Sequence, residues 1–264
     1  MNLGSSCYRL VFAAICAATL LFALITPPFQ SPDENQHYMK ALQLTQGHIL
    51  AETQGKDIGA TLPRAAIDLR DRDFPPEEPG VPTRYNTAML DKAWHADASR
   101  PGTGFGYFPN IANYSPTLYL PQAAGIGIAD AIGLPRLGGL YFGRLVNLTT
   151  ALALLALALR LIPFGQGALL AVAALPTFSY QAGSNSPDVM INGLSFLGLA
   201  LALRFAFGAA TQRQIAALYL VTPLLALAKG IYLPLMAAGL RWPTSRADRR
   251  PLLLLGAMLV GAIL

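Results

Sequence analysis

Two adjacent acidic residues, Asp33 and Glu34, are the part of the sequence best suited to catalysis. They follow the first apolar segment, and His37 comes four residues after Asp33 and three after Glu34. This spacing predicts that the three side chains share one face of a helix. A carboxylate held at a membrane surface could act as general base toward a hydroxyl or an amine. Together, the three side chains could help to hold a divalent metal ion such as Mg²⁺ or Mn²⁺.

The same segment also fits a purely structural role. Ser31, Pro32 and Glu34 predict a capping box, in which Ser31 is the N-cap, Pro32 the first helical residue and Glu34 the third. Negative charge in the first turn of a helix also suits the helix dipole. Capping accounts for these three residues but does not require Asp33, so both interpretations stay open.

A third acidic residue, Asp188, lies in a short polar turn between two apolar segments. Ser186 and Pro187 precede it, which predicts a helix cap with Ser186 as the N-cap. The topology given below places Asp188 on the same membrane face as Asp33. The alternative interpretation is therefore that two acidic turns form one site.

Three further polar residues, Arg144, Asn147 and Lys229, lie within or beside apolar segments. Charged residues in such segments are costly and are often functional. Arg144 and Lys229 could hold a lipid phosphate through charged hydrogen bonds. The alternative for both is that the side chain extends to the membrane surface. We group Asn147 and His37 with them as candidate substrate-binding residues.

The composition indicates that the bilayer surrounds most of the chain. The 264 residues are 53% hydrophobic and 12% charged, with a mean hydropathy of +0.43 and a net charge of +5. Soluble domains carry about 25% charged residues, so an ordinary soluble enzyme is excluded, and so is a disordered protein. The basic residues beside the apolar segments indicate cytoplasmic flanks and not a nucleic-acid site. No P-loop, GxGxxG, GxSxG or HExxH motif is present.

The apolar segments predict an all-α fold, a polytopic transmembrane helical bundle with a long extracytoplasmic first loop that contains membrane-surface helices. We expect a first span at 10–27 with a cytoplasmic N-terminus, a loop at 28–139 and a bundle at 140–264. Within the loop, 32–45 is expected to be a surface helix. Segment 116–134 is expected to lie at the outer interface, because the downstream basic clusters then fall inside. The many prolines and glycines of the loop favour turns over a packed core.

The bundle is expected to contain further spans and one short hairpin. The spans are 140–162, 166–182, 189–208 and one that begins at 251, and the hairpin consists of 214–228 and 231–241. The chain stops within this last apolar run. We therefore expect residues 1–264 to be a single membrane domain that is truncated at its C-terminus.

Five short motifs, in order, resemble the bacterial membrane protein family called domain of unknown function 2142. They are Pro28–His37, Gly59–Pro63, Tyr114–Gln122, Gly143–Asn147 and Pro176–Asp188. That family is similar to the GT-C glycosyltransferases, which transfer a sugar from a polyprenyl-phosphate carrier on the outer face of the membrane.

The resemblance implies a multi-pass enzyme of the bacterial inner membrane whose donor is a polyprenyl-phosphate-linked sugar. Asp33 or Glu34 would be its acidic catalytic residue, and Asp188 would be a second one. Arg144 and Lys229 would bind the phosphate. The alternatives are a non-catalytic membrane protein that binds or transports a polyprenyl lipid, and an inactive fragment.

Overall fold

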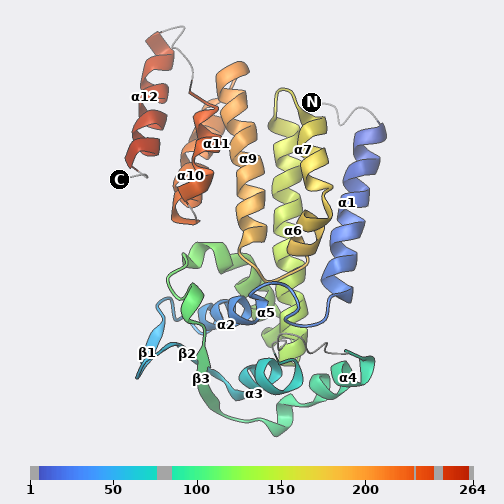
Figure 1. Cartoon of the computed structure of the whole chain (residues 1–264). Helices are drawn as coiled ribbons and strands as arrows, with labels where there is room; N and C mark the ends of the chain where they lie inside the picture. Colours follow the sequence, from blue (N-terminus) through green and yellow to red (C-terminus); the bar gives the residue numbers. More distant parts are fainter. Residues whose placement is uncertain (1–5, 76–84, 229, 241–245, 262–264) are drawn as a thin grey trace. The chain divides into compact units, whose positions relative to one another are not determined.

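The structure is a computed structural model that describes residues 6–75, 85–228, 230–240 and 246–261 (Figure 1). The protein is mostly helical, with 72% of residues in helices. It divides into two compact units, which are treated separately below. The bundle unit consists of Met1–Cys16, Thr150–Phe178 and Met190–Leu264, and the loop unit of Ala17–Thr149 and Ser179–Val189.

Three helices in the described part of the chain are long and apolar enough to cross a membrane. They are α1 (Ser6–Ile25), α6 (Arg136–Leu161) and α9 (Asp188–Phe207), with 20, 26 and 20 residues. A span needs roughly 20 apolar residues, so each is sufficient by length and composition. The helices predicted at 10–27, 140–162 and 189–208 are thus confirmed, with small shifts in their bounds.

The continuous helix predicted at 166–182 is wrong. The segment forms two short helices, α7 (Gln166–Ala173) and α8 (Pro176–Ala182). Proline has no backbone N–H, and its ring clashes with the carbonyl group four residues earlier. Pro176 therefore begins a new helix and does not continue α7.

The C-terminal part of the bundle unit also differs from the prediction. Helix α10 (Gln212–Ala228) is one arm of the expected hairpin. The second arm, predicted at 231–241, is reduced to a 3₁₀ turn η5 (Gly230–Tyr232) and the single turn α11 (Pro234–Ala237). Helix α12 (Arg246–Gly261) follows. The core of this unit is made of buried aliphatic side chains, among them Leu155, Leu159, Ala200, Leu218, Leu225, Met236 and Leu255.

The loop unit contains a three-stranded antiparallel sheet, so the all-α prediction is wrong in this region. The strands β1 (Glu52–Gln54), β2 (Asp57–Pro63) and β3 (Thr103–Tyr107) lie in that order. Thr53 pairs with Ile58, and Thr61 pairs with Phe105. Strand β1 has only three residues, β2 shows no regular alternation of buried and exposed side chains, and β3 joins them from a distant part of the chain. Local sequence therefore gave little sign of a sheet.

The prolines and glycines of this unit do not prevent a packed core, contrary to the prediction. Helix α2 (Glu34–Thr45) packs against β2 and β3 and against α5 (Leu120–Ala131). Its side chains are mostly buried, so it is a core helix and not the membrane-surface helix that was expected. The core includes the fully buried residues Tyr38, Met39, Leu42, Leu62, Phe74, Phe108 and Ile126.

Shorter helical elements complete the loop unit. They are α3 (Arg64–Asp68), η1 (Leu69–Asp73), α4 (Thr87–His95), η2 (Asp97–Ser99), η3 (Pro109–Ile111) and η4 (Pro116–Tyr119). The segment 116–134 consists of η4 and the 12-residue α5. A helix of this length is too short to be a simple span.

Candidate functional site

Glu34 and Arg144 form a fully buried ion pair in the loop unit. Both side chains are 0% exposed. Arg144 Nε donates to Glu34 Oε1 at 2.7 Å, and Arg144 Nη2 donates to Glu34 Oε2 at 2.5 Å. The two parallel hydrogen bonds use the flat geometry of both groups, which is the strongest arrangement that such a pair can adopt. The ion pair joins the first turn of α2 to the membrane helix α6.

Every N–H of the Arg144 guanidinium group is used. Besides Glu34, it donates to the carbonyl oxygens of Ala23 (3.1 Å), Thr26 (2.6 Å) and Pro27 (3.0 Å). These carbonyls belong to the C-terminal end of α1 and the turn that follows it, which have no further helical partners. Arg144 therefore has no N–H left for a lipid phosphate in this structure. Because it is buried, it does not extend to the membrane surface either.

The Glu34 carboxylate also accepts backbone and side-chain N–H groups. Phe29 N donates at 3.1 Å, Asn185 N at 2.9 Å and Asn185 Nδ2 at 3.3 Å. A carboxylate that accepts this many hydrogen bonds is held in one position. Glu34 is thus placed to support the structure and is poorly placed to accept a proton from a substrate.

Two amide side chains hold the polar turn at 183–188 in place. Asn147 Nδ2 donates to the carbonyl oxygens of Ser184 and Ser186, both at 3.0 Å. Gln122 Nε2 donates to Asn185 O at 3.3 Å and to Ser186 O at 3.2 Å. The predicted substrate-binding residue Asn147 therefore fixes the backbone of the turn that carries Asp188.

Glycine at position 143 allows the polar turn to lie directly on α6. A Cβ atom added there would come within 2.3 Å of Asn185 Oδ1. This is far inside van der Waals contact, so any side chain would push Asn185 away from Glu34. Asn185, Gln122 and Gly143 were missed as part of the site, although all three lie within motifs that carry the family resemblance.

The predicted capping box at the start of α2 is wrong. The helix begins at Glu34 with Asp33 as the N-cap, and no side chain caps it. Ser31 Oγ is buried and has no hydrogen-bond partner among the described residues. The Glu34 carboxylate reaches back to Phe29 N and not to Ser31 N, because Arg144 holds it in that direction.

Asp33 differs from Glu34 in backbone conformation and in exposure. Its φ of 55° is left-handed, and so is the φ of 63° at Phe29. Non-glycine residues rarely adopt this conformation, which costs roughly 1–2 kcal/mol. Such strain persists only where the surrounding structure holds it, and here the bonds of Glu34 and Arg144 hold both ends of the segment. The Asp33 side chain is exposed.

His37 lies one turn further along α2 among aromatic residues. It is 5% exposed, and its Nδ1 atom is 2.8 Å from the hydroxyl oxygen of the fully buried Tyr119. Its ring lies 5.8 Å from that of Tyr119 and 6.2 Å from that of Tyr114, measured between centroids. The pair of tyrosines was not singled out from the sequence, although both lie in the motif at Tyr114–Gln122.

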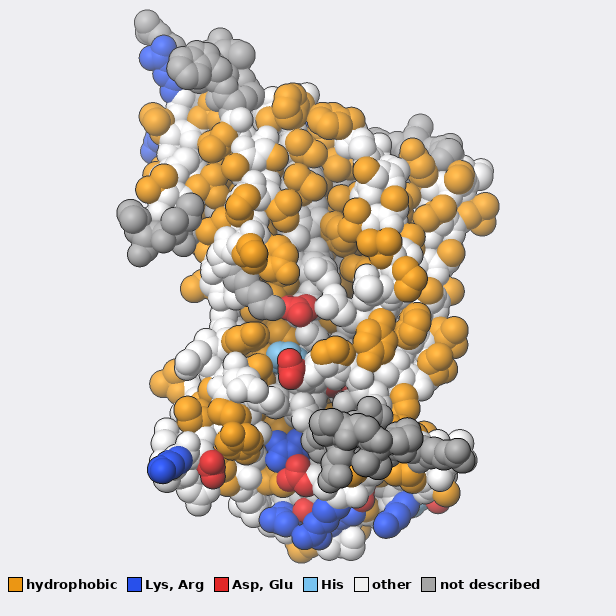
Figure 2. Space-filling model, in the orientation of Figure 1, with side chains coloured by type: hydrophobic (Ala, Val, Ile, Leu, Met, Phe, Trp, Pro, Cys, Tyr) orange, Lys and Arg blue, Asp and Glu red, His pale blue; other side chains and the backbone are white. Residues whose placement is uncertain are grey.

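The charges of Asp33 and Asp188 both act on the Tyr119 hydroxyl. Burial raises the pKa of the Tyr119 hydroxyl, and the nearby Tyr114, Asp188 and Asp33 raise it further in that order. The charges of both carboxylates thus act on one hydroxyl group. We name these five residues, Asp33, His37, Tyr114, Tyr119 and Asp188, the acid–tyrosine cluster. Figure 2 shows a histidine and acidic side chains gathered in one part of the surface.

The predicted cap before Asp188 is confirmed. Ser186 Oγ accepts a hydrogen bond from Asp188 N at 3.2 Å. This bond fixes the start of α9 and leaves the Asp188 carboxylate partly exposed. The two interpretations of Asp188 are thus compatible, because the cap uses Ser186 and the Asp188 backbone.

Two further sequence predictions concern a metal ion and the phosphate-binding Lys229. The described residues contain no group of three or more His, Cys, Asp or Glu side chains placed to hold a metal ion. Glu34 is directed to Arg144, so it does not share one site with Asp33 and His37. Lys229 lies outside the described residues.

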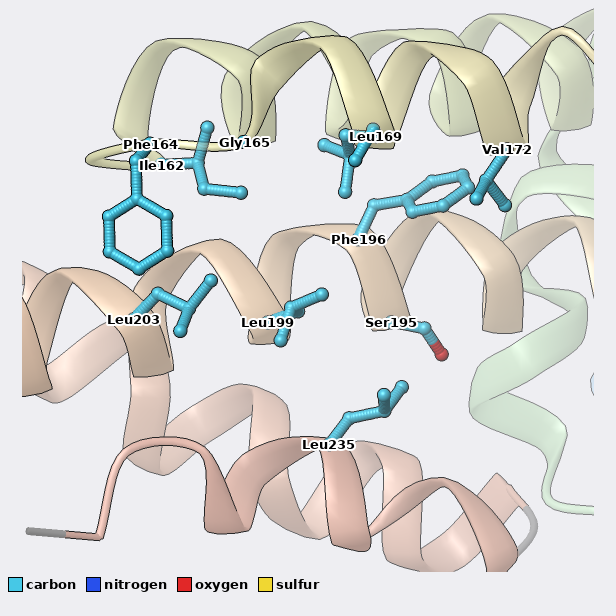
Figure 3. A pocket seen from close by; sticks show the side chains of 11 residues that line it. Ile162, Phe164, Gly165, Leu169, Val172, Ser195, Phe196, Leu199, Leu203 and Leu235 are labelled. Carbon is cyan, nitrogen blue, oxygen red and sulfur yellow. The ribbon is translucent and has the colours of Figure 1, made fainter.

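The bundle unit contains an apolar pocket that the sequence did not reveal (Figure 3). Its volume is about 480 Å³. It is lined by Leu169 and Val172 from α7, Phe196 and Leu199 from α9, and Leu235 from α11. Ser195 Oγ also lies in the lining, buried and without a hydrogen-bond partner among the described residues. The lining suits a hydrocarbon chain.

The three helices of spanning length define a helical membrane protein. The chain belongs to the family described as "Predicted membrane protein (DUF2142)", which matches residues 16–264. The family membership inferred from the five motifs is thereby confirmed. No curated protein and no solved structure matches the chain.

Proposed function

We propose that this protein is a GT-C-like glycosyltransferase of the bacterial inner membrane. It transfers a sugar from a polyprenyl-phosphate carrier to an acceptor on the extracytoplasmic face. The observation that carries the proposal is the buried contact of His37 Nδ1 with the Tyr119 hydroxyl at 2.8 Å, on which Asp33 and Asp188 both act electrostatically from distant parts of the chain. Two acidic positions of this kind are what the motif resemblance to GT-C enzymes implies.

Asp33 is the better general base of the two adjacent acids. Its side chain is exposed and caps no helix, whereas five hydrogen bonds hold Glu34. Asp33 accepts the proton of the acceptor hydroxyl. The acceptor oxygen then bonds to the anomeric carbon of the sugar. The bond from that carbon to the phosphate oxygen breaks, and polyprenyl phosphate leaves with the electron pair.

The other predicted site residues take different roles. Asp188 and His37 orient the acceptor, since they share the acid–tyrosine cluster with Asp33. Glu34, Arg144 and Asn147 form the frame that positions Asp33 and Asp188. Binding of the phosphate by Lys229 stays a prediction from the sequence.

A second candidate is a non-catalytic protein that binds or transports a polyprenyl lipid. The apolar pocket of the bundle unit favours it, because a pocket of about 480 Å³ with this lining accepts a hydrocarbon chain without any catalytic group. The two candidates differ in whether Asp33 is needed for turnover of the donor.

The test is donor cleavage by wild type and Asp33→Asn in lipid nanodiscs. The proteins are given a panel of synthetic polyprenyl-phosphate hexoses and pentoses, together with a membrane extract as the acceptor source. Mass spectrometry follows the release of polyprenyl phosphate. Because general-base catalysis contributes about 10²–10⁴-fold, D33N should lose at least about 100-fold in rate. Asp57→Asn, at an exposed position in β2, is the matched control and should keep the wild-type rate.

The outcomes separate the two functions. Turnover by wild type that D33N abolishes supports the transferase. Equal turnover by wild type and D33N would falsify the role of Asp33. Binding of the polyprenyl-phosphate sugars, detected by native mass spectrometry, without turnover by wild type would support the lipid-binding protein instead.

The proposed topology has its own test by thiol labelling in spheroplasts. Cys7 and Cys16 are replaced by Ser, and single cysteines are placed at the exposed positions Asn113 and Gln212. We expect an impermeant reagent to label N113C in intact spheroplasts and Q212C only after lysis. The reverse pattern would place the loop unit in the cytoplasm, away from an extracytoplasmic donor.

A further inference from the structure

An apolar groove in the loop unit lies beside the C-terminal end of α1. It has a volume of about 400 Å³ and is lined by Leu24 of α1, by Leu90, Asp91 and Trp94 of α4, and by Leu137 and Tyr141 of α6. A smaller cavity next to it shares Leu24, Leu90 and Tyr141. None of these residues has a part in the acid–tyrosine cluster.

The groove continues a surface that must face lipid. Helix α1 is long and apolar enough to cross the membrane, and Leu20, Leu21 and Leu24 are 43%, 56% and 51% exposed along it. Exposed leucines on a spanning helix are solvated by acyl chains. Leu24 belongs both to that surface and to the groove, so the groove places Leu90 and Trp94 next to the part of α1 that lipid would cover.

Trp94 marks the depth of the groove relative to the membrane helices. It is 40% exposed. A Cβ atom added at Gly138 would lie 3.4 Å from Trp94 Cη2, so the indole ring covers the first turn of α6. With 26 residues, α6 is about 39 Å long at 1.5 Å per residue. This exceeds the hydrocarbon thickness of about 30 Å, so the end of α6 reaches the headgroup region.

The side chains of α4 also suit the headgroup region of the membrane. Trp and Tyr are enriched at membrane–water interfaces because the ring is apolar and its polar atom seeks water. On the other side of α4, Lys92 and His95 are exposed, and Asp91 is 79% exposed at the rim of the groove. An amphipathic helix with this division of side chains lies in the plane of the interface.

We propose that α4 is an interfacial membrane helix, and that Trp94 and Leu90 sit among bilayer lipids at headgroup depth, in the groove formed with Leu24, Leu137 and Tyr141. The occupant of the groove is membrane lipid. The helix thus attaches the loop unit to the bilayer at a second place beside the spanning helices. The inference does not depend on the proposed transferase activity.

The experiment uses Trp94 as its own fluorescent reporter. The chain has two tryptophans, so Trp242→Phe leaves Trp94 alone. The full-length W242F protein is reconstituted in phosphatidylcholine vesicles whose acyl chains carry bromine either near the glycerol end or near the terminal methyl group. The matched control is W94F/W242F/Y107W, which places the single Trp at an exposed position of β3.

We expect the shallow bromine to quench Trp94 at least about twofold more than the deep one. Aqueous acrylamide should quench Trp94 less than the Trp of the Y107W control, which neither brominated lipid should quench. The proposal is overturned if neither brominated lipid quenches Trp94 and acrylamide reaches it as readily as the control. Stronger quenching by the deep bromine overturns the headgroup depth.

Discussion

Two groups of ion pairs in the loop unit both join arginine to a carboxylate, but their arginines differ in exposure. The Glu34–Arg144 pair is 0% exposed on both sides and has all its hydrogen bonds satisfied. The second group, the arginine–aspartate cluster, lies near α3, η1 and β3 at the surface, where basic and acidic side chains are mixed in Figure 2. It consists of Arg64, Asp68, Arg70, Asp71, Arg72, Asp73 and Arg100.

The two groups differ in whether water can solvate a charge whose partner is removed. In the arginine–aspartate cluster Arg64 and Arg72 are 43% and 63% exposed, so water solvates them if their partner is lost. The Arg100 pair with Asp73 is tighter, and its hydrogen bonds raise the pKa of Arg100. No water reaches the Glu34–Arg144 pair, which therefore depends on its full set of protein partners.

The two groups of ion pairs therefore have different roles in the structure. A buried ion pair contributes little net stability over an apolar pair, but losing one partner is severe. Such a pair imposes one arrangement on the elements that it joins. Here those elements are α1, α2, α6 and the polar turn, which together position Asp33 and Asp188. In the arginine–aspartate cluster, the pairs that the exposed Arg64 and Arg72 form add only modest attraction.

The largest expected effect is that of Glu34→Gln. The change keeps the shape of the side chain but leaves the Arg144 charge buried without a counter-charge, which costs about 3–5 kcal/mol. The apparent unfolding temperature of the purified protein in detergent should fall steeply, with little dependence on salt. The double variant E34M/R144M should recover part of this loss, because it leaves no unpaired charge. Wild-type unfolding of E34Q would refute the structural role of the pair.

A smaller effect is expected for Asp68→Asn in the arginine–aspartate cluster. Asp68 is 3% exposed and lies 3.1 Å from Arg64 Nε and 3.3 Å from Arg72 Nε. Its Oδ1 atom has no hydrogen-bond partner among the described residues. The loss is therefore electrostatic, about 1 kcal/mol, and should shrink in high salt. Unfolding measured at low and high salt tests this, and a salt-independent loss would contradict it.

The smallest effect is expected for Arg72→Ala. The side chain is 63% exposed, and within the described part of the chain it pairs with Asp68, which also pairs with Arg64 and Arg100. We expect a change in the free energy of unfolding below about 0.5 kcal/mol. The same thermal measurement checks it, with D68N as the reference. A loss larger than that of D68N would show that Arg72 has a structural role comparable to Arg144.

Adjacent residues show where prediction from the sequence reaches its limit. Asp33 and Glu34 are neighbours of the same type, and the sequence assigned both to catalysis. Only the structure distinguishes their roles, because Glu34 binds Arg144, which lies 110 residues away in the sequence. His37 likewise meets Tyr119 across 82 residues. Local patterns carry no information about which distant side chain fills the space.

What the sequence determined by itself depends on neighbouring residues only. The helices α1, α6 and α9 follow from long apolar runs, and the break at Pro176 could have been read from the missing N–H of proline. The Ser186 cap depends on positions two residues apart. Hydropathy, helix caps and motifs depend on neighbouring residues, so they can be recognised without knowledge of the fold.

The tertiary structure alone decided the sheet, the packed core of the loop unit and the frame around the acid–tyrosine cluster. Strand β3 pairs with β2 after an excursion through α3 and α4, which no local pattern records. Buried charge is stable only where several distant segments supply donors together. Arg144 could therefore be recognised as costly from the sequence, but its partners Glu34, Ala23 and Thr26 emerged only when α1, α2 and α6 were packed.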